Sequence, residues 1–356
     1  WGETHNGVKE EKKALMHIPV AGEKLAKGLK RSKDSLKQIF VPGMFFEEMG
    51  VTYIGPIDGH NIRMMEETFR RAFKLNKPIL VHVKTIKGKG YKYAEKHPCY
   101  FHGISSFDVA TGKVKNVEKG LSYTAVFARK LIELGTENNR IVAITAAMSK
   151  GTGVNKFAEE FPDRTFDVGI AEEHAVTFAA GLAAEGMIPV VAVYSSFLQR
   201  AYDQILHDVC MQNLHVIFAI DRSGLVGADG ETHQGIFDTA FLSHIPNLVI
   251  MAPKNRYELT RAMEWAVAYD GPVAIKYARG QAYYGLKDYN EPVEYGKSEI
   301  LREGSEIALV AVGNMVEETE KLYNRFLQEG RQVTFVNARF IKQLDKEMID
   351  HLAETH

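Results

Sequence analysis

Two adjacent carboxylates, Glu172 and Glu173, stand where a short apolar segment gives way to a run of small apolar residues. The segment Phe166–Val168 reads as a strand, and the run after Gly169 reads as a helix whose small side chains allow close packing. A carboxylate in the first turn of a helix is ordinarily a cap or a partner of the helix dipole, and Glu173 fits that use. A buried glutamic acid has a second use, because loss of water disfavours its charged form and keeps it available as a proton donor. Both interpretations of Glu172 stay open on this stretch alone.

Further polar side chains follow predicted strands, and the carboxyl ends of strands are where open α/β sheets bind ligands. They are Tyr194, Arg200, Asp229, His233 and Arg279. Arginine suits bidentate phosphate binding, and histidine titrates near neutral pH and can move protons. Each type also has an ordinary structural use, such as an ion pair on a helix for Arg200 or a turn for Asp229. Their common position nevertheless indicates one ligand site at the strand ends.

The elements that position these groups alternate between helix and strand from about residue 121 to residue 280. Several strands, such as Val190–Val193 and His215–Ile220, are almost continuous apolar runs. Such runs are typical of a parallel sheet whose two faces are covered by helices. A strand–helix–strand pattern precedes this region at residues 51–86, and another α/β pattern begins near residue 306. The predicted fold class is therefore α/β, with domains at residues 1–116, 117–285 and 286–356.

Composition bounds the class of protein. The chain has 356 residues, of which 45% are hydrophobic and 10% aromatic, enough for sizeable cores. A formal charge of −1 without a long basic run argues against nucleic acid or a membrane surface as a partner. No window supplies the roughly 20 uninterrupted apolar residues of a membrane span. Two cysteines make no disulfide framework, so a cytoplasmic location is expected.

Four stretches resemble one family. Gly169–Thr177, Tyr194–Gln204 and Ala219–Gly235 resemble the 1-deoxy-D-xylulose 5-phosphate synthases, in the transketolase group of thiamine diphosphate enzymes, and Pro42–His60 is similar to their first domain. The Asp-Gly-x-Thr-His-Gln element in the third stretch is shared by the wider group, whereas the four together are specific. The resemblance implies a three-domain transketolase-like fold that binds thiamine diphosphate, with mostly parallel sheets flanked by helices.

The resemblance also implies roles for residues that act on the cofactor. Glu172 would be a neutral proton donor to the pyrimidine nitrogen N1′, and Phe197 the face on which the pyrimidine stacks. Tyr91 matches a tyrosine that contacts the cofactor. His102 and His233 match histidines near the reactive ring, where an imidazole can shuttle protons.

A second set of residues would bind substrate. By the same resemblance, Arg200 and Arg279 clamp the phosphate of D-glyceraldehyde 3-phosphate, and Tyr194 adds a hydroxyl donor. Asp229 would orient either His233 or a substrate hydroxyl. Two residues differ from those that are common in the family: Glu173 stands where Gln is common, and Ala278 where Pro is common. Neither difference removes a side chain to which a role is given above.

The implied reaction joins pyruvate to D-glyceraldehyde 3-phosphate with loss of carbon dioxide, giving 1-deoxy-D-xylulose 5-phosphate for isoprenoid and thiamine synthesis. The implied cofactors are thiamine diphosphate and Mg²⁺, and the implied assembly is a homodimer. The family's Gly-Asp-Gly metal motif does not occur in this sequence, so no metal ligand is expected in this chain and the ligands are expected in a preceding segment. Two alternatives are a transketolase and a non-catalytic interaction subunit of the same fold.

Overall fold

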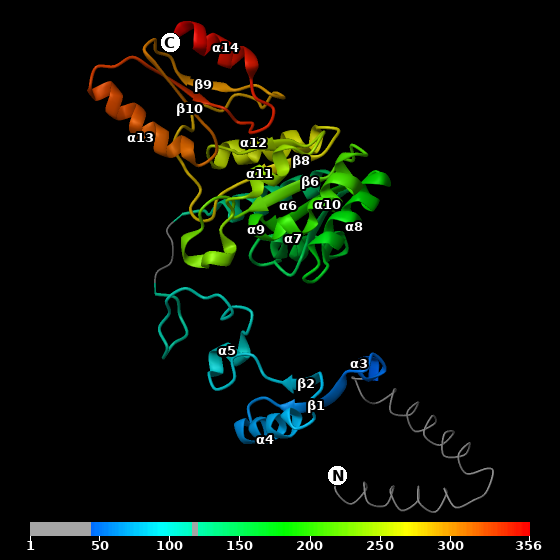
Figure 1. The fold of residues 1–356 in the computed structure, drawn as a ribbon. Coiled ribbons are helices and arrows are strands. Elements are labelled where there is room, and N and C mark those ends of the chain that lie inside the picture. Colours follow the sequence, from blue (N-terminus) through cyan, green and yellow to red (C-terminus); the bar gives the residue numbers. More distant parts are fainter. Residues whose placement is uncertain (1–43, 116–119) are drawn as a thin grey trace, which may run out of the picture. The chain divides into compact units, whose positions relative to one another are not determined.

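The computed structural model describes residues 44–115 and 120–356. They belong to two units, Trp1–Val117 and Glu118–His356, and each is described by itself (Figure 1). The first two residues of the Pro42–His60 stretch lie outside the described residues. No helix within the described ranges is long and apolar enough to cross a membrane.

The first unit is built around a strand–helix–strand unit, as predicted. Strand β1 (Thr52–Asp58) and strand β2 (Ile79–Lys84) are joined by helix α4 (Ile62–Phe73) and pair in parallel. Asn61 begins α4 because its side-chain oxygen accepts the Met64 backbone N–H. Two short helices flank this core, α3 (Met44–Glu48) and α5 (Lys92–Lys96).

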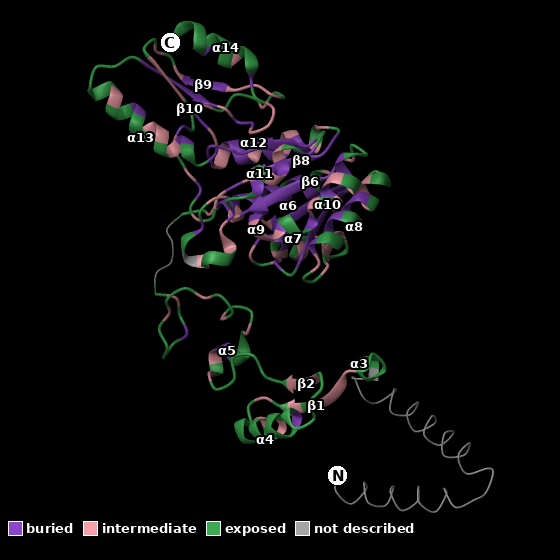
Figure 2. Cartoon of the chain, viewed as in Figure 1, coloured by how far each residue is buried: buried purple, intermediate pink, exposed green. Residues whose placement is uncertain are grey.

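A parallel sheet in the order β4-β3-β5-β6-β8-β7 forms the centre of the second unit. The strands are β3 (Ile141–Thr145), β4 (Thr165–Asp167), β5 (Ile188–Tyr194), β6 (Ile217–Asp221), β7 (Val249–Met251) and β8 (Val273–Lys276). The residues of β3, β5, β6, β7 and β8 are nearly all buried, whereas β4, at the edge of the sheet, is half-buried to exposed. Figure 2 shows β6 and β8 in purple. This confirms the prediction of a sheet covered on both faces.

Helices cover the two faces of this sheet. One face packs on α6 (Tyr123–Glu137), α7 (Val154–Glu160) and α12 (Arg256–Ala268). The other packs on α8 (Glu172–Ala184), α9 (Ser195–Leu198), α10 (Tyr202–Gln204) and α11 (Asp238–Ser243). Alternate strand residues serve each face, so Val190 faces the first layer and Val191 the second.

The region after β5 is not one regular helix. The chain there runs through α9, a 3-10 turn at Gln199–Ala201, α10 and a π-helical segment at Ile205–Cys210. Ile205, Val209 and Cys210 of that segment are fully buried in the layer that contains α8. Tight packing against α8 thus accompanies the change in helical pitch.

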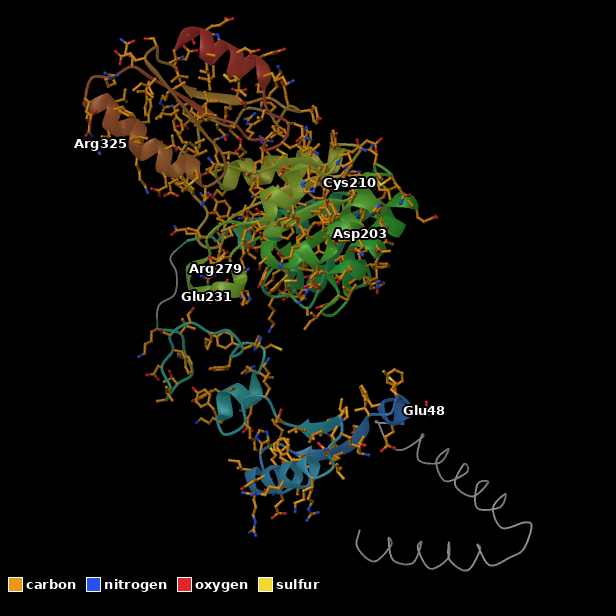
Figure 3. The ribbon with its side chains drawn as sticks, viewed as in Figure 1. Glu48, Asp203, Cys210, Glu231, Arg279 and Arg325 are labelled. Atoms are coloured by element: carbon orange, nitrogen blue, oxygen red, sulfur yellow. The ribbon has the colours of Figure 1, made fainter. Side chains whose placement is uncertain are left out.

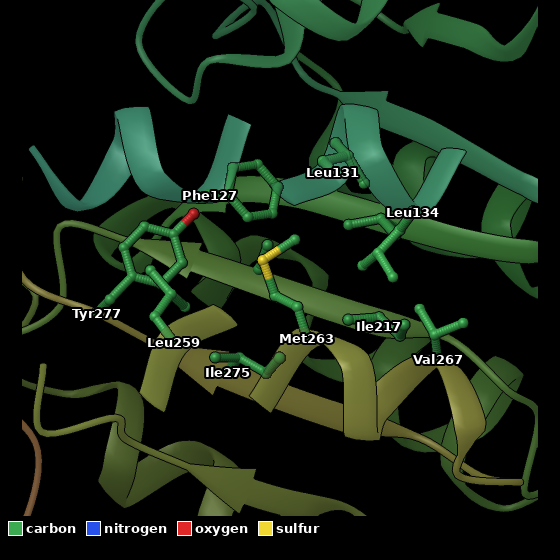
Figure 4. Close-up of a pocket in the computed structure, with 11 residues that line it drawn as sticks. Phe127, Leu131, Leu134, Ile217, Leu259, Met263, Val267, Ile275 and Tyr277 are labelled. Carbon is green, nitrogen blue, oxygen red and sulfur yellow. The ribbon is translucent and has the colours of Figure 1, made fainter. Parts of the chain in front are cut away.

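Only a small internal space remains between α6, α12 and the sheet. Phe127, Met263 and Ile275 are among the apolar residues around it (Figure 4), and its volume is about 10 Å³. A space of that size holds one water molecule at most. This part of the unit is therefore packed core.

A second sheet in the same unit has the order β10-β11-β9. It consists of β9 (Glu299–Arg302), β10 (Ile307–Ala311) and β11 (Val333–Asn337), with α13 (Met315–Gln328) between β10 and β11, and α14 (Lys346–Thr355) after them. The sequence predicts this region from residue 306 onward but not β9, which pairs antiparallel to β11. The three-domain division of the chain stays a prediction.

Candidate functional site

The strand order of the larger sheet fixes where a ligand site belongs. Strands β4 and β5 both neighbour β3, one on each side, so the chain changes direction at β3. In open α/β sheets, a ligand site is expected at the carboxyl ends of two such strands, whose following loops leave in opposite directions. The predicted residues that follow β4, β5 and β6 are therefore carried to one edge of the sheet.

Glu172 is the first residue of α8 and is only 2% exposed. Its Oε2 atom accepts a hydrogen bond from Nη1 of Arg200 at 3.1 Å, although Arg200 itself is half exposed. The burial required for a proton donor is present. The guanidinium, however, is a partner for the carboxylate in its charged form. Glu172 thus has a polar contact that the sequence did not predict.

Three rings lie together beyond β5. The Tyr194 and Phe197 rings are stacked with centroids 5.8 Å apart, and the Phe197 and His233 rings meet edge to face at 5.1 Å. Burial raises the pKa of Tyr194, and the nearby Arg222 opposes the rise. His233 Nδ1 contacts Thr232 Oγ1 at 3.0 Å. The structure therefore brings three of the predicted residues into one aromatic group.

Two arginines converge on one carboxylate oxygen. Asp229 Oδ2 lies 2.9 Å from Arg222 Nε and 3.1 Å from Arg279 Nε. The Arg222 guanidinium also lies 3.8 Å from the centre of the Tyr194 ring and donates to the Gly151 carbonyl at 3.0 Å. Figure 3 shows Arg279 at the loop that carries Glu231. Two planar guanidinium groups around one oxygen make a seat for an anion.

Arg222 is not among the site residues that the sequence analysis predicts. It directly follows Asp221, the last residue of β6, and so obeys the strand-end rule that found the other residues. Its backbone has a φ of 59°, a left-handed conformation that is rare for arginine. Asp221 is fully buried, and burial raises its pKa to about 6 while Thr124 and Arg222 oppose the rise. The signal available in the sequence was the Asp-Arg pair at the start of the glycine-rich loop.

Hydrogen bonds within the glycine-rich loop stabilise the loop that carries these groups. Gly224 and Gly235 exchange backbone hydrogen bonds, and the Gln234 side chain accepts from Val226 N–H and donates to the Gly230 carbonyl. A side chain at Gly235 would overlap the Arg222 carbonyl oxygen. The Asp-Gly-x-Thr-His-Gln element thus folds the loop back on itself.

A buried carboxylate anchors the end of the loop. Asp238 is 2% exposed and accepts hydrogen bonds from Ser195, Ser223 and Lys276. These partners lie after β5, after β6 and at the end of β8. The loop is therefore tied to the three strand ends that surround the site.

The other predicted residues are placed as follows. The structure pairs Arg200 with Glu172 and not with Asp229, where Arg222 and Arg279 meet. Its part in phosphate binding therefore stays a prediction. Tyr91 and His102 belong to the first unit, and their place in the site also stays a prediction. There the Tyr91 hydroxyl donates to the Val109 carbonyl at 2.9 Å, and its ring packs on Phe101.

Thiamine diphosphate fits these residues at its pyrimidine end. The buried carboxyl of Glu172 would supply the acid that the ring nitrogen needs, and Phe197, which is half buried, would supply an aromatic face. For Mg²⁺ the finding is different. Within residues 44–115 and 120–356, no group of three His, Cys, Asp or Glu residues is arranged to hold a metal ion.

Known proteins resemble the chain along its length. Residues 2–85 match the family "1-deoxy-D-xylulose-5-phosphate synthase", residues 119–283 match "Transketolase, pyrimidine binding domain", and residues 296–356 match "Transketolase, C-terminal domain". Among solved structures, a protein titled split gene transketolase, inactive beta4 tetramer, superposes with a TM-score of 0.61 at 29% identity. That match covers 66% of this chain and 77% of the solved one. Transketolase from Campylobacter jejuni, at 18% identity, has the same fold with a TM-score of 0.61 over 87% of this chain and 60% of its own.

Curated relatives are closer in sequence. The 1-deoxy-D-xylulose-5-phosphate synthase of Lachnoclostridium phytofermentans is 55% identical over 96% of this chain, and that of Clostridium tetani is 49% identical over 96%. In both cases the chain spans 55% of the relative's own length. The motifs, the α/β fold and these identities agree. The chain belongs to the 1-deoxy-D-xylulose-5-phosphate synthase family.

Proposed function

We propose that this chain carries the pyrimidine-binding and phosphate-binding parts of a thiamine diphosphate-dependent 1-deoxy-D-xylulose-5-phosphate synthase. The reaction joins pyruvate to D-glyceraldehyde 3-phosphate and releases carbon dioxide. The observation that carries the proposal is the convergence of Arg222 and Arg279 on Asp229 Oδ2, at 2.9 and 3.1 Å. A phosphate presents several oxygens to such a pair, which favours a phosphorylated substrate.

The phosphate seat is completed by neighbouring groups. Tyr194 lies under the Arg222 guanidinium, and its hydroxyl is a further donor to a bound phosphate. Asp229 occupies the seat in this structure, so its carboxylate gives way to the phosphate or turns to a substrate hydroxyl. Arg200 can bind the phosphate only when its contact with Glu172 is broken.

At the other end of the site, Glu172 and Phe197 hold the pyrimidine. Thiamine diphosphate, when bound, supplies the carbon nucleophile of the reaction. The Glu172 carboxyl would donate a proton to the ring nitrogen, and the apolar packing of α8 would keep water from it. His233, at the edge of Phe197, moves protons to and from the substrate oxygen.

The remaining assignments rest on the family alone. We propose that His102 assists the proton transfers, that Tyr91 contacts the cofactor and that Mg²⁺ binds outside the described residues. A homodimer is proposed as the assembly, and the solved split-gene relative is itself described as a tetramer. The cytoplasm is the proposed location.

The test supplies the full-length protein with pyruvate, D-glyceraldehyde 3-phosphate, thiamine diphosphate and Mg²⁺, and measures carbon dioxide and the pentulose phosphate. Release of carbon dioxide that depends on the aldehyde supports the proposal. Ketol transfer from a ketose phosphate without carbon dioxide would show a transketolase instead. Arg279→Met is expected to raise the KM for D-glyceraldehyde 3-phosphate about 10- to 100-fold, since it removes a charge-assisted hydrogen bond. The KM for unphosphorylated D-glyceraldehyde serves as the control and should change little.

A further inference from the structure

The backbone of Arg222 is held in an unfavourable conformation by the residue before it. Asp221 accepts the Arg222 backbone N–H at 2.7 Å, while Arg222 has a φ of 59°. Left-handed backbone at a residue with a large side chain persists only where its surroundings impose it. The Asp221 carboxylate is one such constraint, and it is fully buried.

The carboxylate is itself fixed from the layer beneath. Thr124, in the first turn of α6, donates its hydroxyl to Asp221 Oδ2 at 2.7 Å. Oδ1 accepts the Arg222 backbone N–H and also lies 3.6 Å from Nη1 of the same guanidinium. One carboxylate thus links the rigid sheet and α6 to both ends of Arg222.

The backbone conformation of Arg222 decides where its guanidinium lies. From this position the group covers the Tyr194 ring and donates to the Gly151 carbonyl at 3.0 Å. A relaxed, right-handed backbone at Arg222 would redirect the side chain away from both contacts. The geometry of the anion seat therefore depends on the Asp221 hydrogen bond.

We propose that Asp221 is the positioning residue of the anion seat: its ionised carboxylate holds the Arg222 guanidinium over Tyr194, and its protonation loosens that hold. This inference rests on the proposed function of Arg222 and Arg279 as phosphate ligands. It adds a titratable group that touches no substrate and acts through Arg222. Hydrogen bonds to an ionised acceptor are roughly twice as strong as those to a neutral one, which makes protonation consequential.

Several groups face Asp221 from the elements packed around it. Thr124 faces it from α6, Tyr194 from the end of β5 and Tyr277 from the end of β8, with Arg222 and Asp229 on the loop. Burial is the main cause that raises the pKa of Asp221 to about 6, and Asp229 adds to the rise.

The buried Tyr277 offers no counter-charge. Its hydroxyl has no hydrogen-bond partner within the part of the chain that the structure describes. Figure 4 shows this hydroxyl beside Phe127. The contacts that hold the Asp221 carboxylate are therefore those from Thr124 and Arg222.

The sign of the pH effect follows from this raised pKa. Above about pH 6 the carboxylate is ionised and the seat is formed. Below it the carboxyl is neutral, Arg222 is released and anion affinity falls. A comparison between variants at each pH separates this effect from pH effects that the variants share.

Sulfate is the probe, because its charge does not change between about pH 5 and about pH 8, whereas a phosphate monoester titrates near pH 6. Its Kd is measured by calorimetry for the wild type, Asp221→Asn and Arg222→Met. At pH 8 Asp221→Asn should bind sulfate about tenfold more weakly than the wild type. That ratio should shrink toward one as the pH falls to about 5. A ratio that stays constant with pH, or equal or tighter binding by Asp221→Asn at pH 8, overturns the inference.

Two controls keep the outcomes distinct. Tyr277→Phe changes the same buried region without touching Arg222, so it should leave the Kd for sulfate unchanged. If it weakens sulfate binding as much as Asp221→Asn does, general disturbance of the region explains the effect and the inference fails. If the wild type and Arg222→Met bind sulfate equally, the proposed phosphate site is wrong, and the inference that rests on it is wrong as well. If only Asp221→Asn lacks an effect, the seat stands and the inference alone is wrong.

Discussion

Asp229 Oδ2 lies 2.9 Å from Arg222 Nε, in the position that an anionic substrate group would take between the two arginines. The second arginine, Arg279, approaches the same oxygen at 3.1 Å. The protein thus fills its own anion seat with a side chain from a glycine-rich loop. On the proposed function, the substrate phosphate would compete with that carboxylate for the two arginines.

Asp229→Asn is therefore expected to strengthen sulfate binding by about 3- to 10-fold, because the neutral amide competes less for the guanidinium groups. Calorimetry with sulfate at fixed ionic strength measures the change. Glu231→Gln, on the same loop, controls for the loss of one negative charge. Weaker binding by Asp229→Asn would show instead that the carboxylate supports the arginines.

Glu172→Ala is expected to lower turnover at least about 100-fold, because it removes the proposed proton donor. The fold should survive, since the partner left behind is Arg200, which is 51% exposed at its side chain and can turn to solvent. Carbon dioxide release with cofactor and Mg²⁺ in excess measures turnover, and circular dichroism measures the melting temperature. Undiminished turnover would exclude Glu172 from the chemistry.

The matched variant Arg200→Met removes the other partner of the same contact. It leaves the Glu172 carboxylate, 2% exposed, without its guanidinium. We expect a loss of about 1–2 kcal/mol in the free energy of unfolding, reduced from the buried-pair value because Arg200 is half exposed. A loss of unfolding free energy in Glu172→Ala but not in Arg200→Met would contradict this account of the pair.

The sequence predicts the sheet well because its strands are buried on both faces. Continuous apolar runs such as Val190–Val193 are a signal that needs no tertiary information, and they place Tyr194 and the residues after β6 at strand ends. Two features lie beyond such signals. The contact of Arg200 with Glu172 joins residues 28 positions apart, and only the packing of the segment after β5 on α8 brings them together. The left-handed backbone of Arg222 is the second, because sequence patterns place this residue at a strand end but do not reveal its conformation.

Gly151→Ala is expected to disrupt the anion seat from the opposite side. A methyl group at Gly151 would overlap the Tyr194 hydroxyl oxygen, and the Gly151 carbonyl is the acceptor for Arg222. Overpacking of this kind costs about 1–3 kcal/mol of unfolding free energy and should raise the KM for the aldehyde phosphate.

Gly181→Ala is the matched control, because a methyl group there meets nothing within 4 Å in α8. Alanine is the better helix former, so this variant should be more stable by up to about 1 kcal/mol, with unchanged KM. Denaturant unfolding and steady-state kinetics test both variants. Equal behaviour of the two would show that Tyr194 has room to move.

Asp221→Asn is expected to change stability in a pH-dependent way. The folded-state pKa of Asp221 is raised to about 6 from an ordinary value of 3.8. Between these values the folded protein holds a proton that the unfolded chain has lost, so stability from this group is complete at low pH and declines as pH rises through about 6. At neutral pH the wild type therefore loses unfolding free energy because a buried carboxyl is ionised, and the asparagine variant does not.

Unfolding free energies measured at about pH 4 and about pH 7.5 reveal this cost. The difference between Asp221→Asn and wild type should move in favour of the variant by up to about 3 kcal/mol as pH rises. Asp229→Asn, which removes a carboxylate that is not fully buried, is the comparison. A difference independent of pH would contradict the raised pKa.

Lys254 joins the two sheets of the second unit through buried charges. Its Nζ lies 2.6 Å from Glu299 Oε2 on β9 and 3.4 Å from Glu258 Oε1 on α12, and all three residues are at most 4% exposed. Burial acts to raise the pKa of Glu299, but Lys254 and Arg339 together hold it below its ordinary value. Both carboxylates therefore depend on cations supplied from within the network.

Lys254→Met is expected to lower the unfolding free energy at pH 7 by about 3–5 kcal/mol, because it leaves buried carboxylates short of a cation. Lys297→Met removes an exposed pair with Glu347 and should cost less than about 1 kcal/mol. The depressed pKa of Glu299 gives stability that is present above about pH 4.5 and is lost as pH falls further. Urea unfolding at about pH 7 and about pH 4 should thus show a smaller gap between Lys254→Met and wild type in acid. A gap that is as wide in acid would mean that lysine packing, rather than charge, joins the two sheets.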